Sequence, residues 1–450
     1  MQFDGEDQHA HAADGESMPP AGSESALTMI TVTAAAMCDV TPRSGVRDSW
    51  ARRVWNLLQS ESVGAGRPAR AARIPPGEWT LAIQTPFAAS PRYRPGAWRE
   101  TALLRWAARF DATSAEYDAA RESAALFDRC DRGLLELTGA DRATWLHNLC
   151  TNDVVRLADG QGAYAFAIDV RGRVLFDMNV LARGAALLLD LDAHFVAAAR
   201  AHLERYLIME AVQIADRSDE LTRLGIAGPS AAEHASRVCG AALTDPEFDA
   251  GAKQRLASVG SMAPLASLAL AGGVTLFRHD FCGLPGFELI LPRAAAAAWW
   301  ERGVAAGSLT PAGFDTLDAL RIEAGIPWLG RDIDEKVIPP ETGQAERAIS
   351  YQKGCYLGQE VIERMRSHGA MARRLARLTL ADGAGLAPPA TISHAGKQVG
   401  RLTSLARRPD GESWIGLGYL RTGLLASSAL EVGDPPRPLT VAADSRAAAR

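Results

Sequence analysis

The octet Lys353-Gly354-Cys355-Tyr356-Leu357-Gly358-Gln359-Glu360 is the densest group of chemically useful residues in this chain of 450 residues. Two glycines, Gly354 and Gly358, enclose a thiol, and glycine adopts backbone conformations that other residues avoid. These glycines can hold a turn whose backbone amides come close to a ligand. The pattern therefore indicates a tight turn that carries Cys355 as a functional group.

Residues 361–366 continue from the octet with a helical pattern, so Cys355 is expected just before the start of a helix. A helix dipole and the nearby Lys353 both favour the thiolate over the thiol, which makes a cysteine a nucleophile or a metal ligand. Gln359 and Glu360 complete the turn, and Glu360 can cap the first helical turn. In the alternative interpretation, Cys355 is a small buried apolar residue and the glycines only make the turn.

Residues 113–345 mix helical and strand patterns without strict alternation, which predicts an α+β region. Two apolar strands at 162–170 and 173–181 flank Arg171-Gly172, an arrangement that is typical of a hairpin with a glycine turn. The segment 314–323 has apolar residues at helical spacing. This region therefore predicts a packed core.

The chain changes character after the octet segment, 346–371. Short strands at 375–380, 398–405 and 414–420 are separated by Gly, Pro and Asp turns. This pattern predicts a C-terminal β-barrel over residues 372–442.

Both ends of the chain lack continuous apolar patterning. Residues 1–112 predict a largely disordered extension, with short amphipathic helices at 48–59 and 98–110. The alternative is that this extension comes from an over-extended start codon. Residues 443–450, rich in Ala and Arg, predict a frayed tail.

The overall composition excludes several classes of protein. A net charge of −5 gives no general attraction for nucleic acid, so direct nucleic-acid binding is not expected. No apolar run reaches the roughly 18 residues of a membrane-spanning helix. The six cysteines are scattered singly, as in proteins with reduced thiols, and the acidic start is unlike an export signal. These features predict a cytoplasmic protein without a membrane partner.

No metal or nucleotide motif stands out. The nine histidines form no HExxH pattern and no close i, i+4 pair, so no metal site is predicted. Walker and GxGxxG glycine patterns are absent from the sequence as well. An iron–sulfur cluster held by this chain alone would need several clustered cysteines, and Cys355 has no close sequence partner.

The octet resembles the signature of the YgfZ family of folate-binding proteins, in which lysine, glycine and cysteine precede an aromatic residue, an aliphatic residue and Gly-Gln-Glu. The resemblance spans about residues 116–419 and includes the blocks 135–141, 146–154, 172–180 and 320–325. These blocks are shared with the glycine-cleavage T-protein, an aminomethyltransferase that uses tetrahydrofolate, and only the octet separates the two families. The resemblance implies three domains in a ring around a folate-binding hole, ending in the β-barrel.

The resemblance also implies residues that bind tetrahydrofolate or a one-carbon derivative. Glu288 matches a carboxylate that faces the pterin ring, and a carboxylate can accept hydrogen bonds from the pterin amino and ring NH groups. Asp177 matches one of two paired aspartates in the T-protein, but Phe176 replaces the first, which weakens the case for aminomethyl transfer. Arg321 is a candidate for binding folate carboxylates, and Tyr164 is a candidate for lining the same cavity.

Structural alternatives remain open for these residues. Glu288 can be a strand residue that points to solvent, and a single carboxylate in the Asp177 position can simply anchor a turn. Arg321 can instead form an ion pair with Asp318 or Glu323. Tyr164 can be an ordinary core residue.

Three functions follow from the resemblance. The leading hypothesis is a tetrahydrofolate-binding accessory factor that helps assemble or repair iron–sulfur proteins through Cys355, with Lys353 beside it and with client or assembly proteins as partners. The first alternative is a folate-dependent aminomethyl or one-carbon transferase, the only enzyme reading of this chain. The second alternative is a tRNA-modification factor that acts indirectly.

Overall fold

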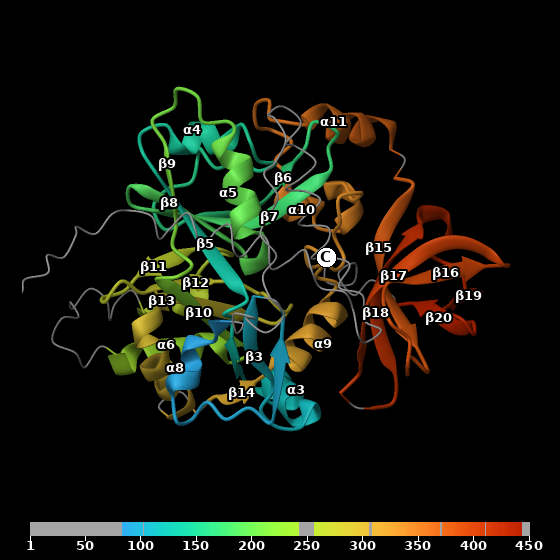
Figure 1. Ribbon diagram of the computed structural model, residues 1–450, viewed down its shortest axis with the longest axis horizontal. Coiled ribbons are helices and arrows are strands. Elements are labelled where there is room, and N and C mark those ends of the chain that lie inside the picture. The colour runs from blue at the N-terminus through green and yellow to red at the C-terminus, as the bar shows by residue number, and fades with distance from the viewer. Residues whose placement is uncertain are drawn as a thin grey trace, which may run out of the picture. The chain divides into compact units, whose positions relative to one another are not determined.

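The computed structural model describes residues 83–101, 103–242, 256–305, 308–369, 371–409 and 411–442. Their strands form a three-stranded sheet, a five-stranded sheet, a six-stranded sheet and a closed barrel (Figure 1). The prediction of a mixed α and β chain that ends in a β-barrel is confirmed. The predicted helix at 48–59 and the predicted tail at 443–450 lie outside the described residues.

The five-stranded sheet has the order β6-β7-β8-β5-β9, and all its neighbouring strands are antiparallel. Its strands are β5 (Arg132–Thr138), β6 (Gly162–Ile168), β7 (Val174–Arg183), β8 (Ala186–Asp192) and β9 (Gln213–Asp216). Two helices accompany them, α4 (Arg142–His147) and α5 (Val196–Glu204). Along β7, Phe176 lies on the face that α5 covers, where its ring packs edge-on against His202. Asp177 and Asn179 therefore lie on the opposite face, because side chains alternate along a strand.

The six-stranded sheet has the order β11-β12-β13-β10-β4-β14, in which only β14 pairs with its neighbour in parallel. Its strands are β4 (Ala125–Asp128), β10 (Leu221–Ala227), β11 (Ser267–Ala269), β12 (Thr275–Arg278), β13 (Gly286–Pro292) and β14 (Thr310–Ala312). It contacts the five-stranded sheet through β10 and β5.

Helices cover both faces of this sheet. One core joins Leu126 of β4 to α6 (Ala231–Ala242) and α8 (Ala296–Ala305), and it contains the fully buried Trp300. The neighbouring Phe127 belongs to a second core with α3 (Thr113–Glu122) and α9 (Phe314–Ala324). Adjacent residues of β4 thus point into different cores, as expected for a strand that is buried on both faces.

The described part of the predicted disordered extension is ordered. Residues 83–109 form β1 (Ile83–Gln84), β2 (Ala97–Glu100) and β3 (Leu104–Arg109), in the order β1-β3-β2. The predicted helix at 98–110 is therefore wrong. At the start of β3, the buried Leu104 and Trp106 flank the less buried Arg105, which fits the two-residue period of a strand. The segment is stabilised by distant aromatic partners, since the rings of Tyr93 and Phe110 pack on Trp300. Local patterning cannot reveal such partners.

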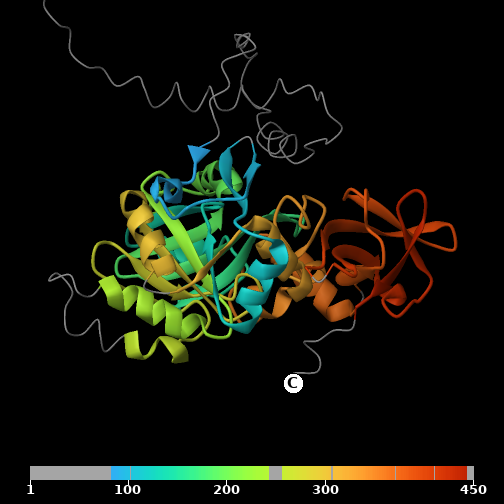
Figure 2. The same ribbon diagram turned by 90° about the horizontal axis from the view of Figure 1, so that it is seen from below.

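The barrel closes in the order β15-β18-β17-β16-β19-β20, and β20 returns to β15. Its strands are β15 (Arg373–Leu380), β16 (Ala390–His394), β17 (Lys397–Arg407), β18 (Trp414–Arg421), β19 (Leu430–Val432) and β20 (Arg437–Val441). It lies to one side of the two mixed sheets in both views (Figure 2). Ile322 of α9 packs against Ile415 and Leu417 of β18, which fixes the barrel to the preceding region. Along the chain, α10 (Ala345–Ala348) and α11 (Gln359–His368) lie between α9 and the first strand of the barrel.

Across the described residues, no helix combines the length and the apolar character that crossing a bilayer requires.

His202 makes the packing of α5 on β7 sensitive to acid. Its ring is buried against Phe176, and Nδ1 lies 2.7 Å from a guanidinium nitrogen of Arg205. Burial, and secondly the charge of Arg205, lower the pKa of His202 to about 4. The neutral ring is therefore the form that the fold accommodates.

We expect acidification to destabilise the chain partly through His202. The unfolded chain binds this proton near pH 6.5 and the folded chain only near pH 4, so stability is lost as the pH falls through that window. The contribution amounts to about 2 kcal/mol between pH 7.5 and pH 5. Urea unfolding of wild type and His202→Leu at both pH values checks this, with the partly exposed His394→Asn as control. Equal pH dependence of wild type and His202→Leu would contradict it.

Candidate functional site

The octet is held in place by the ammonium group of Lys353. Its Nζ donates hydrogen bonds to the backbone carbonyl oxygens of His147, Cys150 at 2.7 Å and Asn152 at 3.0 Å. These carbonyls belong to the end of α4 and to the turn that follows it, where backbone acceptors lack helical partners. Lys353 thus ties the octet to a turn 200 residues earlier in the chain.

This arrangement differs from the predicted role of Lys353 as an activator of the thiolate. An ammonium group has three N–H donors, and here three carbonyl oxygens use them, so none is left for Cys355. Burial lowers the pKa of Lys353. The structure therefore gives this lysine a positioning role.

The turn between Lys353 and α11 is fixed by its own backbone. Gly358 has φ +77°, and a Cβ there would lie 2.3 Å from the carbonyl oxygen of Asp169, so only glycine fits. The side chain of Gln359 accepts a hydrogen bond from the N–H of Tyr356 at 3.2 Å. Glu360 is exposed in the first turn of α11.

Cys355 lies three residues before Gly358, the N-cap of α11. The dipole of a helix acts mainly within its terminal turn, so it reaches Cys355 only weakly. Gly354 on the other side of the thiol is exposed and has open space where a Cβ would stand. The geometry presents the thiol to solvent rather than to a helix end.

The cysteines of the described residues divide sharply by exposure. Cys355 is exposed, whereas Cys130, Cys150, Cys239 and Cys282 are buried. Burial raises the pKa of the four buried thiols, to about 12 for Cys239 and Cys282. Only Cys355 among them is accessible to a reaction partner, so the interpretation of it as a small buried residue is wrong.

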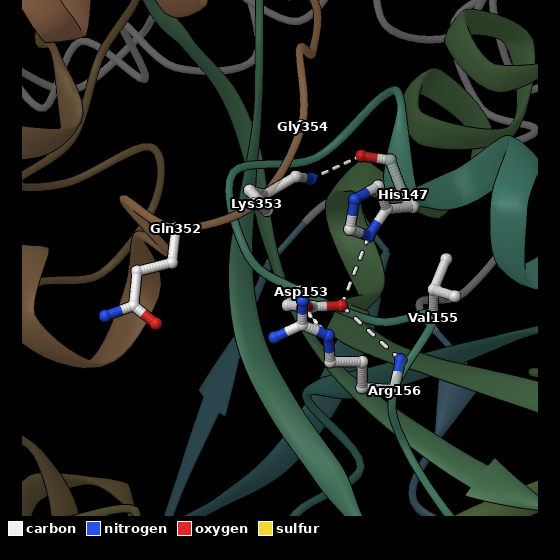
Figure 3. Close-up of a pocket in the computed structure, with 7 residues that line it drawn as sticks. All are labelled: His147, Asp153, Val155, Arg156, Gln352, Lys353 and Gly354. Carbon is white, nitrogen blue, oxygen red and sulfur yellow. Dashed lines mark hydrogen bonds and ion pairs between the residues drawn. The ribbon is translucent and has the colours of Figure 1, made fainter.

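A hollow of about 180 Å³ lies beside the octet (Figure 3). Its lining comprises His147, Asp153, Val155, Arg156, Gln352, Lys353 and Gly354. The carboxylate of Asp153 lies 3.4 Å from His147 Nδ1 and 3.3 Å from Arg156 Nε. Burial, and then the charge of Lys353, lower the pKa of His147. The hollow therefore offers a neutral imidazole and a paired carboxylate next to the thiol-bearing turn.

Tyr164 and Asp177 form a hydrogen-bonded pair, in which the phenol donates to Oδ2 of the carboxylate at 2.9 Å. Arg347 lies over the ring of Tyr164 at 4.0 Å. Asp177 keeps partial exposure, and burial raises its pKa although Arg132 and Tyr164 oppose the shift. Among the predicted folate residues, this carboxylate is the one that retains access.

The turn after α4 connects this pair to the octet. The side-chain amide of Asn152 donates to the carbonyl oxygens of Tyr164 at 2.8 Å and Arg347 at 2.9 Å, while its own carbonyl accepts from Lys353. Asn152 was not a predicted site residue, although the sequence Thr151-Asn152-Asp153 marks a turn. One turn thus positions both the thiol loop and the surroundings of Asp177.

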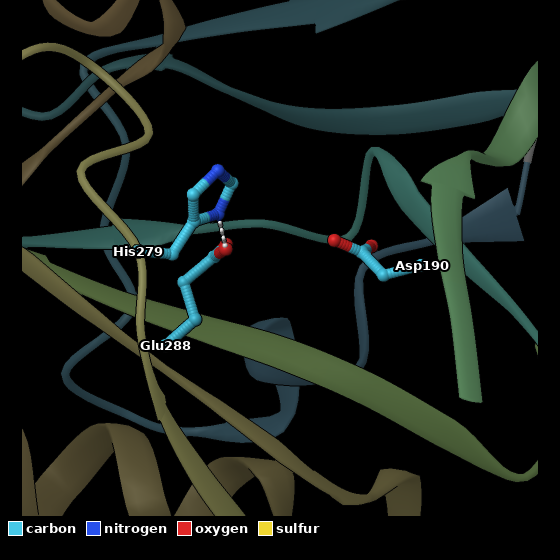
Figure 4. Close-up of side chains that lie close together, drawn as sticks. All are labelled: Asp190, His279 and Glu288. Carbon is cyan, nitrogen blue, oxygen red and sulfur yellow. Dashed lines mark hydrogen bonds and ion pairs between the residues drawn. The ribbon is translucent and has the colours of Figure 1, made fainter. Parts of the chain in front are cut away.

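Glu288 has neither of its predicted surroundings, solvent or an open pocket. Its side chain is fully buried, Oε1 accepts from Arg129 at 3.0 Å, and Oε2 lies 2.5 Å from His279 Nδ1 (Figure 4). Although burial opposes ionisation, Arg129 and His279 lower the pKa of this carboxyl group. Glu288 is therefore a buried ion-pair partner in this structure.

A metal ion does not fit beside Glu288. Asp190, His279 and Glu288 bring ligand atoms within 4.8 Å of one another, which is suitable spacing for a cation. However, Asp190 already pairs with Arg132 at 2.9 Å and with Arg223 at 3.0 Å. Because arginines already neutralise both carboxylates, a divalent ion would bring uncompensated charge into a buried place.

Arg321 forms the ion pair with Asp318 that the sequence analysis gave as its structural alternative. It is fully buried, pairs with Asp318 at 2.7 Å and with Asp332, and donates to Ser404 of the barrel at 2.7 Å. Glu323 is not its partner; that residue accepts from Tyr117 and Arg408. Although burial opposes it, Arg331 and Arg321 hold the pKa of Asp318 at about 2. Arg321 thus joins α9 to the barrel and has no route to a folate carboxylate.

Sequence comparison identifies relatives that cover about two thirds of this chain. A profile of the GCVT N-terminal domain matches residues 75–353. An aminomethyltransferase of Rubrobacter xylanophilus is 31% identical over 307 residues, which cover 68% of this chain and 78% of the relative. The chain belongs to the T-protein, or GCVT, family. A second aminomethyltransferase, from Exiguobacterium sibiricum, is 27% identical over 72% of this chain and 85% of its own length.

A solved structure confirms the T-protein-like fold. The crystal structure of glycine cleavage system aminomethyltransferase T from Bartonella henselae has a TM-score of 0.69 and 19% identity, and the match covers 80% of this chain and 97% of that chain. The family profile ends at Lys353, two residues before the thiol. Family membership therefore does not by itself assign a role to Cys355.

We expect Cys355 to be alkylated far faster than the other described cysteines, because it alone among them is exposed. Iodoacetamide at pH 8 should modify Cys355 at least about tenfold faster than Cys239 or Cys282, whose pKa values burial raises. Peptide mapping of the full chain measures each rate, with the chain in guanidinium as the unfolded control. Similar native rates at all three positions would refute the exposure difference.

We expect Arg321→Met to lower the free energy of unfolding by about 3–5 kcal/mol, because it leaves Asp332 buried without its cation. The control is Arg401→Met, which breaks a partly exposed pair with Asp334 and should cost below about 1 kcal/mol. Urea unfolding measures both variants. A folate-binding arginine would instead leave stability intact, so an Arg321→Met chain as stable as wild type would overturn the structural role.

Proposed function

We propose that this T-protein family member is a tetrahydrofolate-binding accessory factor of the YgfZ type, which acts in the cytoplasm and helps to assemble or repair iron–sulfur proteins through Cys355. The exposed thiol of Cys355, on a turn that Lys353 holds rigidly, carries the proposal. Thiolates are natural ligands for iron and zinc and natural nucleophiles. Within the described residues the other cysteines are buried, so a single thiol has to act with groups from a client protein.

Proteins of the T-protein family use tetrahydrofolate as a one-carbon carrier. Of the predicted ligands, Asp177 fits such a role. The hydroxyl of Tyr164 uses Oδ2 of its carboxylate, which leaves Oδ1 for a ligand, and the side chain keeps partial exposure. Glu288 and Arg321 do not fit, because both are fully buried in ion pairs. We therefore assign the pterin-facing carboxylate to Asp177, with Tyr164 and Arg347 beside it.

Folate-dependent aminomethyl transfer is the second candidate function. Its support is the aminomethyltransferase activity for which the two relatives are named, together with the retained carboxylate of Asp177. A carboxylate whose pKa burial raises can take up a proton more readily than an ordinary aspartate. Phe176, which packs on His202 in the core, replaces the first of the paired aspartates and leaves one carboxylate where the transferases have two.

We expect tetrahydrofolate to bind the full chain and Asp177→Asn to weaken binding at least about tenfold, as loss of one charge-assisted hydrogen-bond acceptor implies. Titration calorimetry measures this, with Asp159→Asn on an exposed loop of the same region as the matched control. Cys355→Ser should keep folate affinity but abolish repair of an oxidised [4Fe–4S] enzyme supplied with iron and sulfide.

The two candidate functions give opposite results in the same set of variants. An accessory factor loses cluster repair in Cys355→Ser and releases no ammonia from an aminomethyl donor. Steady ammonia release that Asp177→Asn abolishes and Cys355→Ser retains would show a transferase. Normal cluster repair by Cys355→Ser would refute the accessory role.

A further inference from the structure

Three exposed apolar side chains lie on segments that contact or adjoin the turn that carries Cys355. Val155 is 44% exposed and lines the hollow next to Gly354, and Tyr351 is 36% exposed just before the octet. Val170, 70% exposed, is at the tip of the hairpin between β6 and β7. Large exposed apolar side chains gathered in one region mark interaction surfaces more often than single ones do.

The hairpin tip and the octet are in direct contact. A Cβ on Gly358 would meet the carbonyl oxygen of Asp169, and a Cβ on Gly172 would lie 2.9 Å from Val361 of α11. Figure 1 shows α11 beside this end of the five-stranded sheet. Oδ1 of Asp169 accepts the N–H groups of Arg171 and Arg173 at 2.8 and 2.9 Å, so the tip is a fixed turn. Val170 therefore stands in a defined position relative to the thiol-bearing turn.

Each of these apolar side chains has an arginine next to it. Arg156 follows Val155 with a side chain that is 76% exposed, and the Arg366 guanidinium lies 4.9 Å from the ring centre of Tyr351. The exposed Arg171 follows Val170.

The charges at this surface favour an acidic partner. Arg156 pairs with Asp153, and Arg366 pairs with Glu363. Arg171 has no carboxylate within ion-pair distance among the described residues, and its neighbour Arg173 also lacks one. The exposed Glu360 at the start of α11 and the partly exposed Asp169 at the hairpin tip are the opposing charges. Arg171 and Arg173 are thus the cations of this surface that have no ion pair within it, in a chain whose net charge is −5.

We infer that Val155, Val170, Tyr351 and the arginines beside them form a docking face for an acidic, apolar protein segment whose cysteine sulfur meets Cys355. The inference rests on the proposed function and adds the chemistry of the partner. Apolar side chains of the partner would cover the three exposed residues, and its carboxylates would meet the arginines, which favours association with the correct partner. Arg is also the cation that is enriched at such interfaces.

Thiol–disulfide exchange tests the docking face without a known client. The probes are two short peptides with one cysteine among leucines, flanked by glutamates in one and by lysines in the other, each activated as a mixed disulfide with thionitrobenzoate. The Cys355 thiolate attacks the peptide sulfur and forms a protein–peptide disulfide, while thionitrobenzoate leaves with the electron pair of the broken S–S bond. The peptide disulfide is the oxidant, and the absorbance of thionitrobenzoate gives the rate.

We expect the glutamate peptide to react at least about tenfold faster than the lysine peptide, with a difference that shrinks in high salt. Arg171→Glu and Val170→Ser should each slow the glutamate peptide several-fold and leave a small neutral mixed disulfide unaffected. Arg421→Glu, on an exposed position of the barrel, is the matched control for charge.

Equal rates for the two peptides, or an Arg171→Glu chain that behaves as wild type, would overturn the docking face. Failure of the proposed function can be told apart from failure of the docking face, because the function is measured by folate titration and cluster repair and the docking face by the peptide rates. Intact repair by Cys355→Ser together with a large peptide preference would refute the function and keep the face.

Discussion

The need to neutralise buried carboxylates governs how the two large sheets of this protein meet. Glu288 of β13 and Asp190 of β8 are both fully buried, and each is matched by arginine, Arg129 in one case and Arg132 with Arg223 in the other. Removing one member of such a set leaves a charge that has no water to solvate it. The Asp190–Arg223 pair joins β8 of one sheet to β10 of the other. Together the pairs leave no room for a cation or for direct contact between Glu288 and a ligand.

The same principle, applied to backbone groups, positions the thiol. The carbonyl oxygens after α4 need donors, and the buried ammonium of Lys353 supplies three hydrogen bonds to them. Asn152 extends this contact to the backbone of Tyr164 and Arg347. A lysine that sequence reasoning placed in the chemistry is thus a structural support, whereas Cys355 is exposed and Asp177 is half-buried.

Much of the fold followed from local patterns. The hairpin of residues 162–181 and the helix near 314–323 appear where the sequence pattern placed them, because a glycine turn and the spacing of apolar residues act on neighbouring positions. The segment 98–110 did not follow its pattern, because its partners are Trp300 and the strand pairs of a small sheet, which lie outside any local window. Glu288 and Arg321 show that the prediction of site residues has the same limit. The sequence around a charged residue does not reveal whether that residue contacts a ligand or a buried counter-ion.

The sequence by itself determined the hairpin of residues 162–181, the helix near 314–323, the β-barrel end and the presence of a glycine-framed cysteine, because periodicity and glycine content act locally. Tertiary structure alone decided which charged groups remain accessible. Arg321 pairs with Asp332 and donates to Ser404, and Glu288 pairs with Arg129 and His279. Lys353 donates its hydrogen bonds to carbonyl groups of a distant turn. The physical reason is that burial and pairing depend on contacts between residues tens to hundreds of positions apart, which spacing along the chain does not encode.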